Sequence, residues 1–130
     1  AAAAFPVSNL TIVLVSSAAA RVGLANHEAI AAAKAGVIGL TLSAAATYAG
    51  SGIRVNCVAP GLVRTPATAR ITANEASLKM SEQMHPLGRI GDPQDVASAI
   101  AWLLDPEAGW VTGQVIGVDG GLATVRSRGT

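Results

Sequence analysis

The stretch TIVLVSSAAARVGLANHEAIAAAKAGVIGL, residues 11–40, decides the fold of this chain. It opens with a continuous β-branched and aliphatic run at residues 11–16, which is typical of a strand buried on both faces in a parallel sheet. A loop follows, and Asn26 is predicted as the N-cap of a long helix with Glu28 in its first turn, ending near Ala49. A buried strand followed by a long helix predicts the first part of a strand–helix–strand crossover.

The rest of the chain continues this alternation of strands and helices. Residues 53–58 predict a second buried strand that stops at Pro60, and residues 114–118 predict a third. Between them, residues 65–84 are polar and alanine-rich, which indicates short helical pieces in a candidate mobile flap. Residues 92–105 predict a helix that starts with an aspartate cap and a proline at its first position. We therefore predict an α/β fold with a parallel sheet and flanking helices.

The composition indicates one domain or part of one. The 130 residues are 51% apolar and 13% charged, with a formal net charge of +1. No basic run predicts a nucleic-acid partner, and no apolar run is expected to approach the ~20 residues that span a bilayer. The single cysteine, Cys57, excludes an internal disulfide, and we expect a cytoplasmic protein. Because so apolar a chain has more surface to bury than one small domain hides, we expect it to pack against a further protein surface.

Four short motifs follow one another along the second half of the chain. They are RVNCVAPG at 54–61, PLGRIGDP at 86–93, VTGQ at 111–114 and VDGG at 118–121. With the strand, serine and lysine of the opening stretch, they resemble the short-chain dehydrogenase/reductase family, and within it the 3-oxoacyl-acyl-carrier-protein reductase-like branch. Each motif alone is weak, but their order over residues 11–122 makes the resemblance strong. It implies the C-terminal part of a doubly wound parallel-sheet Rossmann fold, with about three strands and flanking helices.

The resemblance implies a catalytic group that contains Ser17 and Lys34. In this family a serine, a tyrosine and a lysine promote hydride transfer between a nicotinamide and a carbonyl or alcohol carbon. Ser17 would polarise the substrate oxygen, and Lys34 would hold the nicotinamide ribose. The separation of Ser17 and Lys34 agrees with the family, but Ile30 stands where the tyrosine is expected.

The resemblance also implies a cofactor-binding segment for NAD or NADP. The Pro60–Gly61 turn, Val63 and Thr65 would flank the nicotinamide, and Thr65 would bond to its carboxamide or to the phosphates. The family's Gly-rich turn after the first strand, which binds the dinucleotide phosphates, has no counterpart in this sequence. Residues 1–130 thus correspond to the C-terminal half of the domain, and the dinucleotide-phosphate-binding N-terminal half is absent from this chain.

An isoleucine cannot transfer the proton that accompanies a hydride, so another group must do so. His27 precedes Lys34 by about two helical turns, or ~10 Å along the axis, and a neutral histidine acts as acid or base near pH 7. Glu28 is a weaker candidate for the base, because it points about 100° away from His27 around the helix. Tyr48 is not expected to replace the tyrosine, because it lies far along the helix and is predicted to be a partly buried aromatic. The plainer interpretations are a solvated His27, a Ser17 that caps the strand end and a solvated Lys34.

Three further residues receive structural predictions. Cys57 is predicted as a buried thiol, His85 as loop surface, and Asp119 as a residue that orients the last turn. No metal site is predicted.

Three functional hypotheses follow. The first is an NAD- or NADP-dependent oxidoreductase for a small carbonyl or alcohol substrate, with His27 or water as proton carrier. The second is a cofactor-binding or scaffold pseudoenzyme, which Ile30 motivates, and the third is an inactive fragment of the parent enzyme. In the family the long helix lies in a subunit interface, so its alanines and glycines predict a homo-oligomer. Neither nucleic acid nor a membrane is expected as a partner.

Overall fold

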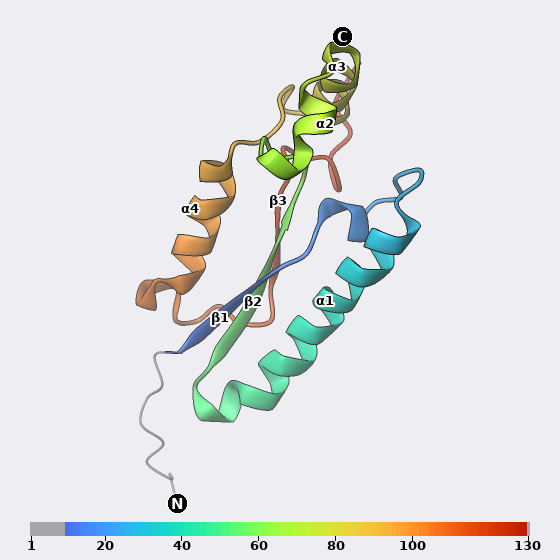
Figure 1. Cartoon of the computed structure of the whole chain (residues 1–130). Helices are drawn as coiled ribbons and strands as arrows, with labels where there is room; N and C mark the ends of the chain where they lie inside the picture. Colours follow the sequence, from blue (N-terminus) through green and yellow to red (C-terminus); the bar gives the residue numbers. More distant parts are fainter. Residues whose placement is uncertain (1–9, 130) are drawn as a thin grey trace, which may run out of the picture.

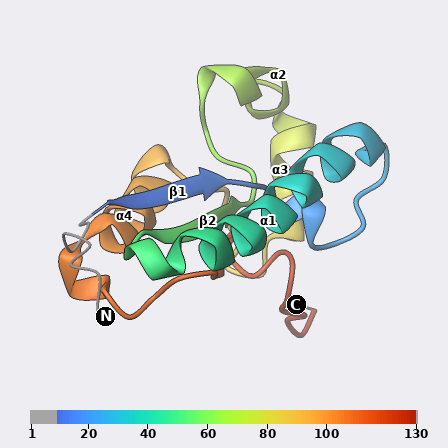
Figure 2. The same cartoon turned by 90° about the horizontal axis from the view of Figure 1, so that it is seen from below.

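The computed structural model describes residues 10–129 as one parallel sheet with helices on both faces (Figure 1). In the sheet order, the strands are β1 (Thr11–Val15), β2 (Arg54–Pro60) and β3 (Val115–Val118). Helix α1 (Glu28–Tyr48) lies on one face and helix α4 (Pro93–Leu104) on the other (Figures 1 and 2). The predicted α/β fold with three parallel strands is confirmed.

Shorter helices connect these elements. They are η1 (Ala18–Ala20), η2 (Ala49–Ser51), η3 (Pro66–Thr68), α2 (Ala69–Thr72), α3 (Glu75–Met84) and η4 (Pro106–Ala108). The pieces η3, α2 and α3 confirm the helical segments predicted for residues 65–84, and Figure 1 shows α2 and α3 beyond the carboxyl ends of the strands. This arrangement puts α2 and α3 next to the edge of the sheet where α/β proteins bind ligands.

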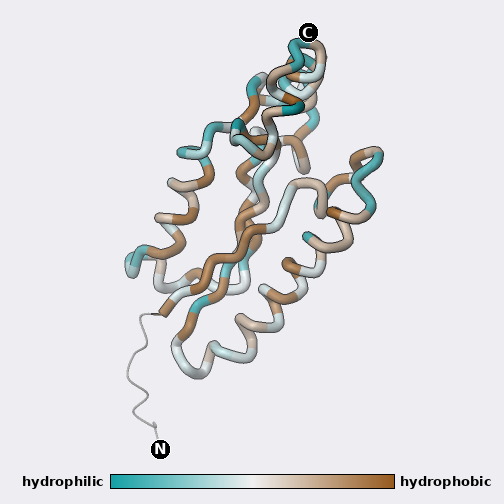
Figure 3. Tube along the Cα trace, in the orientation of Figure 1, coloured by the Kyte–Doolittle hydropathy of each residue, from teal (hydrophilic) through white to brown (hydrophobic). Residues whose placement is uncertain are grey.

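Strand β2 forms the core of the described structure. It pairs with β1 on one side and with β3 on the other, and Val55, Cys57, Val58 and Ala59 are fully buried. Figure 3 shows the hydrophobic segments that run along β1 and β2. Cys57 is therefore the buried thiol that the sequence predicts.

Strand β1 is less buried than its sequence predicts. The side chains of Ile12 and Val15 are 41% and 43% exposed, so the prediction of burial on both faces is wrong for them. The reason is that, within residues 10–129, β1 is an edge strand that pairs with β2 alone. An open edge with apolar side chains is the surface where we expect a further protein element to pack.

Helix α1 begins one residue later than predicted. Asn26 is not the N-cap, because its φ of 62° places it in the left-handed region that asparagine tolerates. His27 occupies the cap position, and Glu28 lies in the first turn as predicted. The helix ends through η2 at Gly52, whose φ of 72° requires the conformational freedom of glycine.

The segment Glu28–Ser51 is long and apolar enough to cross a membrane by length and composition. The expectation that no apolar run approaches this length is therefore wrong. Only 11% of its most apolar window is buried within the described structure, although the helix packs against β2. Helices that pack in the core or at an interface of a folded protein meet the same criterion of length and composition. What the structure shows is a broad apolar surface on α1 that residues 10–129 leave uncovered.

Helix α4 begins with the predicted cap. Asp92 occupies the N-cap and its backbone N–H donates to Asp95 Oδ2 at 2.8 Å, while its own side chain accepts from the first turn. Pro93 takes the first helical position, where no N–H is needed. At the other end, Arg54 of β2 donates to the carbonyl oxygen of Leu103 at 2.9 Å, which satisfies one terminal acceptor of the helix.

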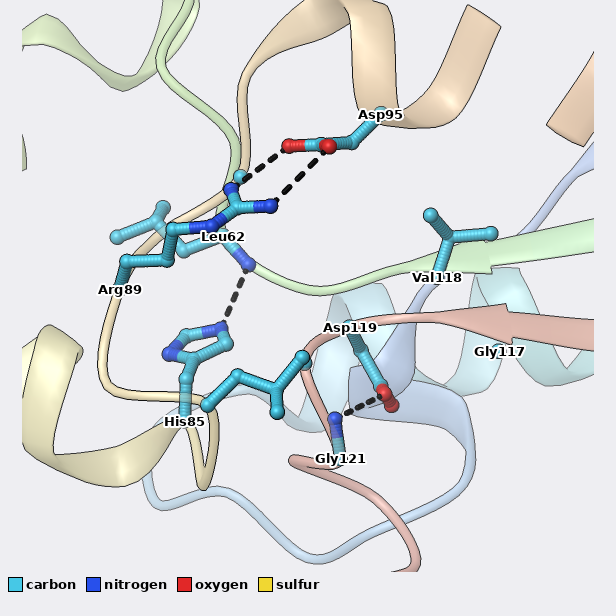
Figure 4. Close-up of a pocket in the computed structure, with 11 residues that line it drawn as sticks. Leu62, His85, Arg89, Asp95, Gly117, Val118, Asp119 and Gly121 are labelled. Carbon is cyan, nitrogen blue, oxygen red and sulfur yellow. Dashed lines mark hydrogen bonds and ion pairs between the residues drawn. The ribbon is translucent and has the colours of Figure 1, made fainter. Parts of the chain in front are cut away.

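Asp95 also forms a bidentate ion pair with Arg89, with distances of 2.8 and 3.2 Å (Figure 4). The hydrogen bonds from Arg89, and then the Asp92 N–H, lower the pKa of Asp95 from 3.8 to about 2. Because the folded-state pKa is lowered, the stabilising effect is fully present above the ordinary value of 3.8 and is lost as the pH falls through about 2. We expect Arg89→Gln to raise the pKa of Asp95 toward 3.8, as measured by NMR titration of its carboxyl carbon.

The matched control for this titration is Arg70→Gln, an exposed arginine on α2. It should leave the Asp95 pKa unchanged. If Arg89→Gln also left that pKa near its wild-type value, the backbone N–H of Asp92 would account for the shift, and the ion pair would not.

Candidate active site

Two hydrogen bonds join α1 to the carboxyl end of β1. The buried Ser16 donates from Oγ to the backbone oxygen of Lys34 at 2.7 Å. In return, the Lys34 Nζ donates to the backbone oxygen of Val15 at 3.1 Å. Lys34 is therefore held at the strand end by a hydrogen bond that remains exposed to solvent. Its ammonium group lies at the edge of the sheet where ligands of α/β proteins bind.

Ser17 follows directly after this strand end. Its Oγ accepts the backbone N–H of Ala19 at 3.1 Å, so Ser17 caps the start of η1, whereas the plainer interpretation expected it to cap the strand end. A hydroxyl that accepts one hydrogen bond keeps its own proton for donation. Ser17 can therefore cap η1 and still donate to a substrate oxygen.

A cavity of about 370 Å³ brings several of the predicted site residues together. Ser17, His27 and Ile30 line it from the start of η1 and the start of α1, and Pro60 and Gly61 line it from the end of β2. The other lining residues are Ala18, Ala19, Leu24, Leu62, Thr68, Ile71, Ser81, Met84, His85 and Leu122. A small, mostly apolar cavity with a few polar groups is the usual form of a small-molecule site.

His27 reaches this cavity from outside the helix. Its φ of −118° and ψ of 18° are not helical, so the prediction that it shares a helix face with Lys34 is wrong. The Nδ1 atom lies 2.8 Å from the backbone oxygen of Ala25, and residues 10–129 provide no partner for Nε2. Nε2 is thus the ring atom available to a ligand.

Ile30 lies one helical turn before Lys34 and is 46% exposed. Residues four apart in a helix lie on the same face, so Ile30 and Lys34 share one face of α1. The structure therefore places an apolar side chain at position 30 in the lining of the cavity that Ser17 also lines.

The predicted cofactor segment lines a second, open hollow of about 430 Å³. Pro60, Gly61, Val63 and Thr65 all contribute to it. The remaining lining residues are Leu62, Thr68, Pro93, Val96, Ala97 and Ile100. Such an apolar wall suits the face of an aromatic ring, so these residues fit a nicotinamide. The backbone N–H of Thr65 donates to Thr68 Oγ1 at 3.0 Å, and the two hydroxyl oxygens lie 3.3 Å apart, which orients the Thr65 side chain.

The prediction that His85 lies on the loop surface is wrong. Its side chain packs closely behind this segment and is only 4% exposed. Its Nε2 accepts the N–H of Leu62 at 3.1 Å, and its Nδ1 lies 2.6 Å from the backbone oxygen of Ser81. A Cβ atom on Gly61 would lie 2.7 Å from His85 Nε2 and 3.1 Å from the Cα of Asp119. A histidine before a proline predicts an exposed turn, but here the segments around Gly61 and Gly120 cover it.

Sequence reasoning missed the roles of Ser16 and His85. Two adjacent hydroxyls at a strand end were the only signal for Ser16, and the pleat of the strand decides which of them points inward. Asp119 behaves as predicted, since its carboxylate accepts the N–H groups of Gly121 and Ala123 at 2.9 and 3.1 Å and so orients the last turn.

Comparison with known proteins places this geometry among oxidoreductases. A family model described as enoyl-(acyl carrier protein) reductase matches residues 1–123. The chain is 49% identical over 114 residues to cis-4-hydroxycyclohexanecarboxylate dehydrogenase of Sinomonas cyclohexanicum, covering 88% of this chain and 45% of that protein. It is 46% identical over 114 residues to a 3-oxoacyl-[acyl-carrier-protein] reductase of Thermotoga maritima, covering 88% of this chain and 46% of that protein. The chain thus spans about half the length of the curated relatives it matches.

Solved structures agree with these relatives. A 4-hydroxyisoleucine dehydrogenase complexed with NADH has a TM-score of 0.83 at 33% identity, covering 86% of this chain and 46% of that chain. Other solved structures similar to this chain hold bound NADP. The expected cofactor class, NAD or NADP, is therefore that of the matched proteins.

Proposed function

The chain belongs to the short-chain dehydrogenase/reductase family, and from that premise we propose that it supplies the substrate-binding half of an NAD- or NADP-dependent oxidoreductase. The reaction is hydride transfer between the nicotinamide, which gives or takes the hydride when bound, and the carbon of a small alcohol or carbonyl compound. One observation carries the proposal. Ser17 and Gly61 line one apolar cavity at the carboxyl edge of the sheet, and Lys34 is held at the same edge.

Different residues of this chain bind the substrate and the cofactor. Ser17 donates its hydroxyl proton to the substrate oxygen and so polarises the carbonyl bond. Lys34 binds the nicotinamide ribose hydroxyls with its ammonium group. The Pro60–Gly61 turn and Val63 form the apolar wall against the nicotinamide ring, and Thr65 bonds to the carboxamide or the phosphates.

The proton that balances the hydride takes a route other than a tyrosine. When a carbonyl is reduced, its oxygen gains a proton, and when an alcohol is oxidised, its hydroxyl loses one. Ile30 can do neither, whereas His27 lines the same cavity as Ser17, and its Nε2 has no partner within residues 10–129. We assign the proton transfer to His27 or to a water molecule beside it. Removing a positioned acid or base typically lowers the rate about 10²–10⁴-fold, so we expect slow turnover.

The proposal includes a second half that binds the dinucleotide phosphates, and residues 1–130 are then the C-terminal half of the domain. Its support is that the chain spans 45% to 46% of its relatives and carries no Gly-rich turn after a strand. We further propose a cytoplasmic homo-oligomer that uses the uncovered apolar surface of α1.

The test is carried out on the complete protein, the form whose intact mass is well above the 12.9 kDa of this chain. Calorimetric titration with NADH and NADPH should show binding of at least one of them. Lys34→Ala should weaken that binding about tenfold, because a charge-assisted hydrogen bond is lost. Cyclic secondary alcohols should be assayed first, since the cavity is apolar and the Sinomonas relative is a dehydrogenase of such a compound. A protein that binds neither cofactor would contradict the proposal.

A pseudoenzyme is the second candidate function, and Ile30 is the observation that favours it. Such a protein would bind cofactor or act as a scaffold without turnover. Oxidation of any alcohol that disappears in Lys34→Ala would exclude it. The third possibility, an inactive fragment, would be supported if the protein in its native source had a mass of 12.9 kDa and bound neither cofactor.

A further inference from the structure

A buried histidine separates the candidate site from a second cavity. This second cavity has a volume of about 360 Å³ and includes Arg89, Asp95 and Asp119 among its lining residues. It shares only Leu62 and His85 with the lining of the cavity that contains Ser17. Figure 4 shows the imidazole of His85 beneath the backbone of Leu62, with the hydrogen bond between them.

The backbone that follows β2 is held in place by a small set of hydrogen bonds. They run from Gly61 N–H to Val118 O (3.1 Å), from Leu62 N–H to His85 Nε2 (3.1 Å), from Gly91 N–H to Leu62 O (2.8 Å) and from Arg64 N–H to Gly91 O (2.8 Å). Three of these bonds join backbone groups, which any sequence could make. The bond to His85 is the only one of the four that depends on a side chain.

The partners of His85 determine which of its ring nitrogens carries the proton. A backbone N–H can only donate, so Nε2 must accept from Leu62 with its lone pair. The proton then lies on Nδ1, which donates to the backbone oxygen of Ser81 on α3. One neutral tautomer of the ring thus connects α3, which covers the cavity, to the segment Pro60–Leu62 at the end of β2.

We infer that His85 is a positioning residue, which fixes the Leu62 N–H and the Pro60–Gly61 turn relative to α3. Its consequence for catalysis rests on the proposed function, in which this turn lies against the nicotinamide. The ring has little freedom to move, because it is 4% exposed and both of its nitrogens have backbone partners. Displacement of the turn would move the nicotinamide relative to the substrate, and small displacements reduce rates strongly.

Two substitutions separate this role from general packing. The amide group of His85→Gln can reach the position of Nε2 and accept from Leu62, whereas the shorter amide of His85→Asn can replace only Nδ1. In the complete protein, we expect His85→Asn to increase the exchange rate of the Leu62 amide hydrogen about tenfold, the effect of losing one hydrogen bond. We expect its kcat to fall about tenfold, and His85→Gln to stay within about twofold of wild type in both measurements.

Other outcomes would overturn the inference. If both variants lost kcat and amide protection equally, His85 would only fill space. If His85→Asn kept the wild-type kcat and His85→Gln did not, the bond to Ser81 would be the important one. If neither variant folds, the ¹⁵N chemical shifts of His85 in the wild type decide, since a proton on Nε2 excludes the bond from Leu62. If the wild type shows no turnover with NAD or NADP, the proposed function fails, and amide exchange together with the tautomer still decides whether His85 holds Leu62.

Discussion

Ile30→Tyr is expected to raise the kcat of the complete protein about 10²–10⁴-fold, the usual contribution of a positioned acid or base. The substitution puts a phenol at position 30, between Ser17 and Lys34 in the sequence, where the family resemblance implies a tyrosine. Position 30 lines the cavity together with Ser17, and the native side chain is 46% exposed, so the larger ring has room. The Lys34 ammonium, one helical turn further along, would favour the phenolate form. Steady-state oxidation of a cyclic secondary alcohol measures the gain.

The matched control for this gain is Ile30→Phe, which adds the ring without the hydroxyl. It should leave kcat near the wild-type value, and Lys34→Ala in the Ile30→Tyr background should remove most of the increase. If Ile30→Tyr and Ile30→Phe behaved alike, proton transfer would not be the missing step. A loss of the wild-type rate in His27→Gln would then support the histidine route.

Gly61→Ala is expected to lower the free energy of unfolding by about 3 kcal/mol, at the upper end of the usual cost of overpacking. The added Cβ would lie 2.7 Å from His85 Nε2 and 3.1 Å from the backbone Cα of Asp119. The histidine ring is held at both nitrogens, and the Asp119 backbone belongs to the turn that its own carboxylate orients. Neither neighbour can move without breaking hydrogen bonds, so the strain falls on the end of β2.

Urea denaturation followed by circular dichroism measures this loss, and Gly50→Ala serves as its control. A Cβ on Gly50 would meet no atom within 4 Å, so the control should stay within about 0.5 kcal/mol of wild type. Combining Gly61→Ala with His85→Asn should recover part of the loss, because the contact with Nε2 disappears while the contact with Asp119 remains. Equal stability of Gly61→Ala and Gly50→Ala would show that the close approach at Gly61 does not exist in solution.

The elements of the fold were largely predictable from local patterns. The apolar runs at 11–16 and 53–58 predicted strands, and the Asp-Pro start at residue 92 predicted α4 with its cap. The helix start was misplaced by one residue, because Asn26 can both cap a helix and adopt a positive φ, and local sequence does not separate the two. Burial of β1 was overpredicted, since an apolar run does not say whether neighbouring strands are present in the same chain.

The candidate site was predictable only in part. Ser17, Ile30 and the segment around Gly61 follow from spacing and family resemblance, and the structure brings them to one cavity. The helical relation between His27 and Lys34 was wrong, because His27 caps the helix and lies outside it.

By itself, the sequence determined the alternation of strands and helices, the family, and the presence of an isoleucine at position 30. These features depend on residues close together in the chain, on hydrophobic periodicity and on residue identity. Only the tertiary structure decided that Ser16 points inward to hold Lys34, and that a buried His85 supports the backbone after β2. It also decided that Gly61 must lack a side chain, since Asp119 and His85 approach it from distant parts of the sequence. Such contacts leave no pattern in the local sequence. Strand pairing and the packing of loops at the sheet edge decide which groups meet.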